Sequence, residues 1–368
     1  MASCDVLVRG AGAVGLAAAL ALARQGLAVA LLGADGRAPG PDIRVYALNP
    51  AAVELLRSLR VWDALPAEAR TAVYDMHVEG DAPGATLDFS AWSQGTEQLA
   101  WIVDAAELEA ALLTAARYAP HLSVVKTEVE APLQVVAEGK ASPTRARLGV
   151  GVQSHRYGQR AVAARLDALW PHAGLARQWF RSPDVLALLP FDRPRAGHGY
   201  GLVWSVPDER ADELMALSAP EFEQALADAT AGASGALTLA GERATWPLTI
   251  ARAEQVSGPG WVLVGDAAHV VHPLAGQGLN LGLADVAALA RVVAAREPWR
   301  GLGDARLLAR YARERAAPTL AMGQLTDALL QLFASERPLL RELRNRGLGL
   351  VDRLAPVKRF LAARALDA

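Results

Sequence analysis

The chain has 368 residues and a formal net charge of −2, with 37 Lys and Arg against 39 Asp and Glu. This length fits one large discontinuous domain or two interleaved domains, and the charge balance argues against a nucleic-acid partner. A single cysteine, Cys4, excludes an internal disulfide, and no Cys/His cluster is available for zinc, so we expect no metal site. Without an export signal or a long apolar segment, a cytoplasmic protein is expected.

The first predicted elements form a β-α-β unit. An apolar strand over 5–8 leads into a glycine loop, an Ala- and Leu-rich helix ends near Gly26, and a second strand covers 27–32. The loop has the G-x-G-x-x-G spacing, in which backbone can approach a pyrophosphate at the N-terminus of the helix. A purely structural glycine turn is the alternative. The predicted cofactor contacts in this loop are Gly10, Gly12, Ala13, Val14 and Gly15.

The second strand ends without the usual acidic residue. A carboxylate at this position normally accepts hydrogen bonds from the adenosine ribose. Gly33 occupies it here, and the nearest carboxylate is Asp35. Asp35 either binds the ribose from the following turn or is a solvated turn residue.

The middle of the chain mixes helices with strands. Helices are predicted over 49–58 and 105–118, and an alternating polar stretch between 73 and 103 indicates antiparallel strands. From 157 to 246, strand-like pieces such as 201–206 alternate with loops rich in Pro, Arg and Gly. We interpret this region as a second, sheet-based domain.

A second motif follows a predicted strand over 261–264. The run Gly265-Asp266-Ala267-Ala268-His269 places an aspartate where it can accept a ribityl hydroxyl of a flavin. The loop 273–278 then opens a helix whose backbone amides can face the flavin N1 and C2 carbonyl. The predicted contacts are Gly265, Asp266, Pro273, Gly276, Gln277, Gly278, Leu279 and Asn280.

The run GDAAHVVHPLAGQGLNLGLADV resembles the flavin-binding signature of the para-hydroxybenzoate hydroxylase class, and most closely that of the ubiquinone-biosynthesis hydroxylases. Further matching segments are DIRVYAL around Arg44, YGQ at 157–159, ALLPF at 187–191 and LVWS at 202–205. The resemblance implies an α/β protein: a Rossmann-type FAD-binding fold with an interleaved α+β substrate part and a C-terminal helical segment.

The resemblance also assigns segments and residues. It implies an FAD-binding domain over 1–72, 101–150 and 255–320, a β-sheet substrate domain over 73–100 and 151–254, and C-terminal helices over 321–368. It places Arg44 beside the cofactor. Glu138-Gly139 stands where the family carries an Asp-Gly pair that serves FAD and NAD(P)H, and the short segment before it indicates that a family hairpin is missing.

The implied activity is that of an FAD-dependent monooxygenase in ubiquinone biosynthesis, acting through a flavin C4a-hydroperoxide. FAD carries the reaction, so no catalytic side chain is required by the sequence. The partners are dioxygen, a hydrophobic aromatic or polyprenylated quinone precursor, and NAD(P)H or an external electron donor. Two alternatives stay open: a flavin-dependent reductase or dehydrogenase, and a non-catalytic flavin-binding scaffold of a biosynthetic complex.

Histidines and tryptophans are weaker candidates. His269 and His272 are expected to pack and hydrogen-bond around the cofactor, whereas His172 and His198 are either acid/base groups or structural. Six tryptophans either line an aromatic pocket or belong to the core: Trp101, Trp170, Trp179, Trp204, Trp246 and Trp261.

The C-terminal segment differs in charge from the rest of the chain. From Gly301 onward it carries twelve Lys and Arg against seven Asp and Glu, with apolar residues at helical spacing. Such helices either pack on the FAD-binding domain or contact the inner membrane surface as a peripheral protein.

Overall fold

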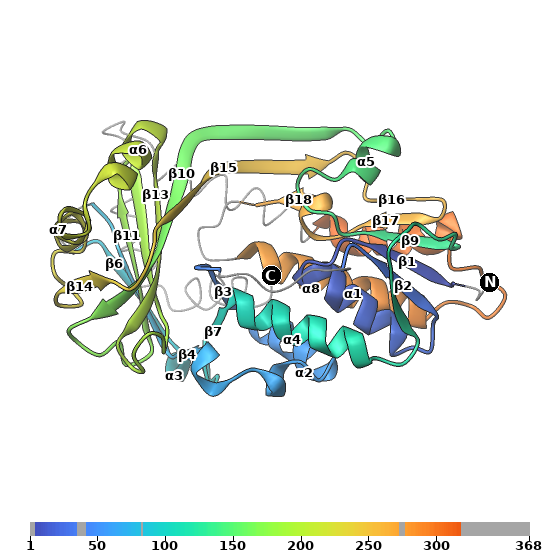
Figure 1. Ribbon diagram of the computed structural model, residues 1–368, viewed down its shortest axis with the longest axis horizontal. Helices are drawn as coiled ribbons and strands as arrows, with labels where there is room; N and C mark the ends of the chain where they lie inside the picture. Colours follow the sequence, from blue (N-terminus) through green and yellow to red (C-terminus); the bar gives the residue numbers. More distant parts are fainter. Residues whose placement is uncertain (1–3, 35–41, 82–83, 272–276, 318–368) are drawn as a thin grey trace.

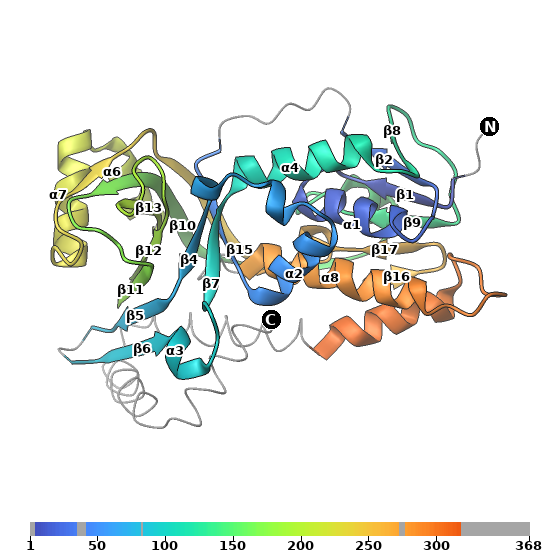
Figure 2. The ribbon, with the colours of Figure 1, turned by 90° about the horizontal axis from the view of Figure 1, so that it is seen from below.

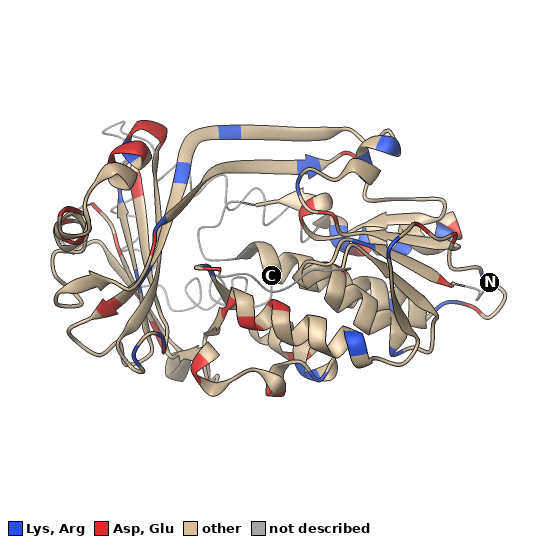
Figure 3. Cartoon of the chain, viewed as in Figure 1, with Lys and Arg blue, Asp and Glu red and all other residues tan. Residues whose placement is uncertain are grey.

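Two lobes make up the fold, one built on a parallel sheet and the other on a large, mostly antiparallel sheet (Figure 1). The computed structural model describes residues 4–34, 42–81, 84–271 and 277–317. In Figure 3 acidic and basic residues are interspersed along the chain in both lobes.

The parallel-sheet lobe has the strand order β16-β17-β9-β1-β2-β8. β1 lies at its centre, parallel to β2 and β9, and all four of its residues are buried. The strands are β1 Val6–Arg9, β2 Val29–Leu32, β8 Leu122–Val125, β9 Leu133–Val136, β16 Ser257–Gly258 and β17 Trp261–Leu263.

Helix α1 (Ala13–Ala23) is apolar on every side because it packs between α4 (Ala105–Tyr118) and α8 (Gln277–Ala294). It starts directly after β1, so its N-terminus points out of the carboxyl end of the parallel sheet (Figure 1). In α/β folds this edge is where ligands bind.

The antiparallel-sheet lobe has nine strands in the order β18-β15-β10-β13-β12-β11-β5-β6, with β14 paired to β10. Its strands are β5 Asp75–Glu79, β6 Thr86–Ser90, β10 Val152–Ala168, β11 Leu175–Arg181, β12 Asp184–Pro190, β13 Gly199–Pro207, β14 Leu237–Leu239, β15 Ala244–Ala253 and β18 His269–Val270. The long pair β10 and β15 reaches from this lobe toward α5 (Pro143–Arg147), beside the parallel sheet (Figure 1).

Two helices cover one face of the antiparallel sheet, α6 (Asp208–Ala216) and α7 (Ala219–Thr230). Sequence patterns did not predict them, because both are short and lie within a region interpreted as strands and loops. One signal was present: Ser218 and Glu221 form a capping box in which the Ser218 N–H donates to the Glu221 carboxylate at 2.8 Å.

A small third sheet lies between the lobes (Figure 2), with the order β3-β7-β4. Its strands are β3 Val45–Leu48, β4 Arg70–Val73 and β7 Ala100–Asp104. Close to it lie α2 (Pro50–Ser58), the short helix α3 (Ala91–Gln94) and the 3-10 turns η1 (Trp62–Ala64) and η2 (Ala67–Ala69).

The predicted α/β class is confirmed, as are the N-terminal β-α-β unit and the helix over 105–118. Residues 126–132 join β8 to β9 without a hairpin, as the short segment indicated. Residues 305–317 are helical, and the predicted tail over 321–368 lies outside the described residues. Within the described part of the chain no helix is long and apolar enough to cross a membrane.

Candidate functional site

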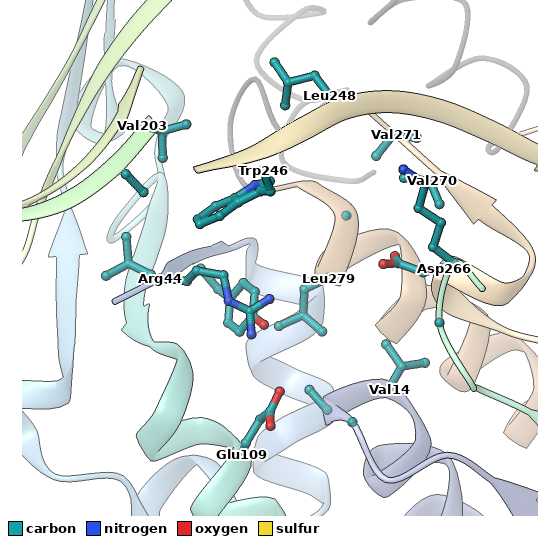
Figure 4. Close-up of a pocket in the computed structure, with 18 of the residues that line it drawn as sticks. Val14, Arg44, Glu109, Val203, Trp246, Leu248, Asp266, Val270, Val271 and Leu279 are labelled. Carbon is teal, nitrogen blue, oxygen red and sulfur yellow. The ribbon is translucent and has the colours of Figure 1, made fainter. Parts of the chain in front are cut away.

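A cavity of about 620 Å³ lies between the two lobes (Figure 4). One side is formed by the glycine loop, the start of α8 and the loop after β17, and the other by strands β10, β12, β13 and β15. Its charged lining residues are Arg44, Glu109, Lys140 and Asp266, and none of them belongs to the antiparallel sheet. The cavity therefore has a polar wall and an apolar wall.

The three glycines of the first loop have different surroundings. A Cβ on Gly10 or Gly15 would collide with backbone, at Ala137 O and Gly10 O respectively. A Cβ on Gly12 would meet nothing within 4 Å. Gly12 is also the N-cap of α1, and no side chain caps this helix. Free N–H groups facing open space fit the pyrophosphate of a dinucleotide.

Asp266 lies in the 3-10 turn η3 (Gly265–Ala267) and lines the cavity. Its side chain is exposed at the cavity, and desolvation by the surrounding protein raises the pKa of its carboxyl. The charges of His269 and Arg44 act in the opposite direction. Gly265 has a φ of +59°, and a Cβ there would lie 3.2 Å from the methyl groups of Val14.

The second glycine-rich motif is only partly within the described residues. Gly278 and Leu279 line the cavity at the start of α8, which begins at Gln277. Asn280 does not line it, because its side chain donates to Ala47 O at 2.8 Å and accepts from Asn49 N at 3.1 Å. Asn280 thereby ties α8 to the end of β3. The remaining predicted contacts, Asp35, Pro273 and Gly276, lie outside the described residues, as does His272.

Arg44 lines the cavity from the segment before β3. Its Nε donates to Asp42 Oδ1 at 2.9 Å, and its guanidinium lies 5.7 Å from the centre of the Tyr46 ring. Arg165 of β10 holds the backbone of this segment, donating to Ile43 O at 2.7 Å and to Arg44 O at 2.9 Å. The antiparallel-sheet lobe thus fixes a residue predicted to contact the cofactor.

Glu138 has local partners. Its carboxylate accepts from Ser142 Oγ at 2.6 Å and from the backbone N of Thr144 at 2.9 Å, at the start of α5. Glu138 is not among the cavity-lining residues, whereas Gly139 and Lys140 are. The carboxylate of the Glu-Gly pair caps a short helix, and its assignment to a cofactor stays a prediction.

Gly33 has a φ of +98° and is exposed. A Cβ there would lie 3.8 Å from Gly10 Cα. The residue thus makes a left-handed turn over the glycine loop, which explains why glycine stands at this position. A glutamate at this position would therefore be strained.

Sequence patterns missed four polar lining residues: Tyr46, Glu109, Lys140 and Thr249. Burial raises the pKa of Tyr46 to about 12, so its hydroxyl stays protonated. In Figure 4 Glu109 of α4 points toward Arg44. Glu109 gave no signal, because a glutamate on a predicted amphipathic helix is usually interpreted as solvent-exposed.

The two candidate histidines of the second domain are structural. His172 Nδ1 accepts from Gly174 N at 3.0 Å, and its Nε2 lies 3.4 Å from Asp192 Oδ1. His198 Nδ1 contacts Ala168 O at 3.1 Å. Neither lines the cavity.

Of the six candidate tryptophans, only Trp246 lines the cavity, while Trp179 and Trp204 are buried. Trp170 is 55% exposed, and Trp101 and Trp261 are partly buried.

Comparisons with known proteins identify relatives of this chain. A family model described as an FAD binding domain matches residues 3–131 and 95–326. Ubiquinone hydroxylase UbiL of Rhodospirillum rubrum is 32% identical, with 98% of this chain and 89% of that protein covered. The 3-demethoxyubiquinol 3-hydroxylase of Escherichia coli is 31% identical, with 96% of each chain covered.

Solved structures match the fold. The p-nitrophenol 4-monooxygenase PnpA of Pseudomonas putida aligns with a TM-score of 0.78 at 17% identity, covering 100% of this chain and 99% of that one. A probable FAD-dependent monooxygenase of Pseudomonas aeruginosa, pqsL, gives 0.77 at 23% identity, covering 94% and 99%.

The chain belongs to the family of FAD-dependent aromatic monooxygenases. Within this family, the two curated relatives described above are ubiquinone hydroxylases at about 30% identity.

Proposed function

We propose that this FAD-dependent hydroxylase acts on a hydrophobic quinone-precursor ring in ubiquinone biosynthesis. The observation that carries the proposal is the two-sided cavity, in which a polar wall beside α1 faces an apolar sheet. The names of its relatives support the same substrate class.

The polar wall fits FAD. The uncapped N-terminus of α1 at Gly12 would hold the pyrophosphate, and Asp266 would accept a hydrogen bond from a ribityl hydroxyl. Arg44 would add a positive charge beside the cofactor. When bound and reduced, FAD activates dioxygen so that one oxygen atom can be transferred to an electron-rich ring. The protein's part is to position the two reactants and to exclude water.

The apolar wall fits an uncharged ring. It is formed by Ala163, Ala187, Leu189, Leu202, Val203, Trp246, Pro247 and Leu248, together with Thr249, whose hydroxyl is uncharged. None of these side chains can neutralise a carboxylate, and burial of an unpaired charge is strongly unfavourable. Trp246 offers an indole face for ring contact (Figure 4). A prenylated phenol without a carboxyl group could bind against this wall without burying an unpaired charge.

The reductant is proposed to be NAD(P)H or a separate electron donor that visits the site transiently. The sequence holds no second dinucleotide loop. Lys140 lines the cavity and offers a positive charge there for an anionic donor.

A matched pair of ligands tests the substrate proposal. A short-chain prenylated phenol should perturb the absorption spectrum of the bound flavin, because it enters the cavity. The same phenol carrying a ring carboxylate should bind at least about tenfold more weakly, since each 1.4 kcal/mol changes an affinity tenfold. Equal binding of the two ligands would contradict an uncharged substrate.

The pathway is tested in a strain that lacks the gene. We expect this strain to accumulate a quinone precursor that lacks one ring hydroxyl and to recover when the gene is restored. An unchanged quinone profile would exclude a role in ubiquinone biosynthesis.

A further inference from the structure

A fully buried carboxylate lies behind the loop that carries Asp266. Asp285 of α8 has 0% of its surface exposed, and its two oxygens accept hydrogen bonds from three sides. It does not line the cavity, so it does not itself meet the cofactor. An ionised group at this depth requires compensation, which makes its partners informative.

One oxygen of Asp285 holds both ends of the loop 265–269. Asp285 Oδ2 accepts from the backbone N of Gly265 at 2.9 Å and lies 2.6 Å from His269 Nε2. Asp266 sits between these two anchor points and faces the cavity. A shift of Asp285 would therefore move both anchors of the turn that carries Asp266.

The other oxygen of Asp285 is bound by the helix over 305–317. Arg315 Nε donates to Asp285 Oδ1 at 2.7 Å. One helical turn earlier, Tyr311 donates its hydroxyl to Leu263 O at 2.8 Å, at the last residue of β17. This helix thus contacts both the strand that enters the loop and the carboxylate that holds it.

The charges in this cluster are balanced. Burial alone would raise the pKa of Asp285, but His269, Arg315 and the Gly265 N–H together hold that pKa below its usual value. Arg315 is always cationic, so it supplies a permanent positive charge to the ionised carboxylate. His269 Nε2 donates a second hydrogen bond to the same ionised carboxylate.

We propose that Arg315, acting through Asp285, is a positioning residue that orients Asp266 toward FAD. The inference rests on the proposed role of Asp266 as a flavin ligand. The helix over 305–317 contributes no residue to the cavity lining. The proposal assigns it a role in cofactor binding.

A double-mutant cycle on FAD affinity separates this role from simple stability. We expect D266N to weaken FAD binding by about 10- to 100-fold, the range for loss of a charge-assisted hydrogen bond. R315M should weaken it by about tenfold in the wild-type background but by less than about threefold when D266N is already present. The measurements are FAD dissociation constants by flavin fluorescence, with melting temperatures of the same samples.

R313M is the matched control. Arg313 lies on the same helix, is exposed, and has no side-chain partner among the residues that the structure describes. It should leave FAD affinity and the melting temperature unchanged. If R315M does not fold, R315Q replaces it in the cycle, because glutamine also removes the charge. R315K is the conservative variant: lysine keeps the charge and should retain most of the affinity.

Two results would overturn different statements. Unchanged FAD affinity in D266N would refute the assignment of Asp266 itself. A normal loss in D266N with fully additive effects of the Arg315 variant would refute the positioning role while leaving the flavin site in place.

Discussion

At the scale of single residues, two glycines of the glycine loop have different roles: Gly10 permits close packing, and Gly12 leaves space for a ligand. We predict that Gly12→Ala leaves the free energy of unfolding nearly unchanged but weakens FAD binding, because the added methyl group enters open space at the N-terminus of α1. Gly10→Ala should instead lower the free energy of unfolding by at least about 1–2 kcal/mol, because Gly10 has a φ of +102° and its Cβ would collide with Ala137 O. Urea unfolding of the apo-proteins and flavin titration measure the two quantities.

Each of these two variants serves as the control for the other, because one should lose FAD affinity and the other stability. Loss of stability in Gly12→Ala without loss of affinity would show that this glycine also serves packing, and would remove the main support for a pyrophosphate at this helix.

The structural reason for a glycine at position 33 could not be predicted from the sequence. The absent acidic residue was visible in the sequence, but the reason for the glycine was not, because backbone φ is set by how the turn lies over Gly10. A Gly33→Glu variant would therefore mix backbone strain with any gain in affinity.

At the scale of elements, Asp104 joins a helix cap to an ion pair between the lobes. Its Oδ1 accepts from Ala106 N at 3.0 Å at the start of α4, and its Oδ2 lies 3.2 Å from an Arg165 nitrogen. We predict that D104N keeps the cap and loses the ion pair, whereas D104A loses both. D104A should be less stable than D104N by about 0.5–2 kcal/mol in urea unfolding. Equal stabilities would show that the cap contributes nothing.

His172 predicts a pH dependence of stability. Burial lowers the pKa of His172, which the charge of Asp192 only partly offsets. The folded state therefore favours the neutral ring, whose Nδ1 accepts from Gly174 N. This contribution is present above about pH 6.5, the unfolded value, and is lost as the pH falls through the lower folded value.

The matched variant is H172N, whose amide oxygen can accept the same hydrogen bond without titrating. The stability difference between wild type and H172N should shrink as the pH falls from about 7.5 to about 5. If the two unfolding curves shift in parallel over this range, His172 does not titrate as described.

The elements that could be predicted are those with a strong local pattern. The helix over 105–118 has an apolar stripe and an N-cap aspartate, and the first β-α-β unit has its glycine loop. Helices α6 and α7 were missed because their burial depends on a distant sheet, which no local window contains. The site was partly predictable for the same reason: Gly12 and Asp266 lie in local motifs, whereas Glu109 and Lys140 reach the cavity only through the tertiary fold.

At the scale of the whole molecule, the cavity exists because two lobes meet. The ribbon of β10 and β15 and the small sheet β3-β7-β4 connect the lobes, and Arg165 fixes the segment of Arg44 between them (Figures 1 and 2). The cofactor wall and the substrate wall are therefore supplied by different sheets. Long-range pairing of this kind has no sequence signal except resemblance to a family.

The central claim is that this chain transfers one oxygen atom from dioxygen to an aromatic ring. The most direct measurement is a single turnover with holoenzyme that has been reduced anaerobically, mixed first with a short-chain prenylated phenol and then with isotopically labelled dioxygen. This design does not depend on the identity of the electron donor. We predict a hydroxylated product that carries one labelled oxygen atom, formed in an amount up to that of the bound flavin. A reduced or unchanged ring, or a product oxygen derived from water, would contradict it and would favour a reductase or a non-catalytic scaffold.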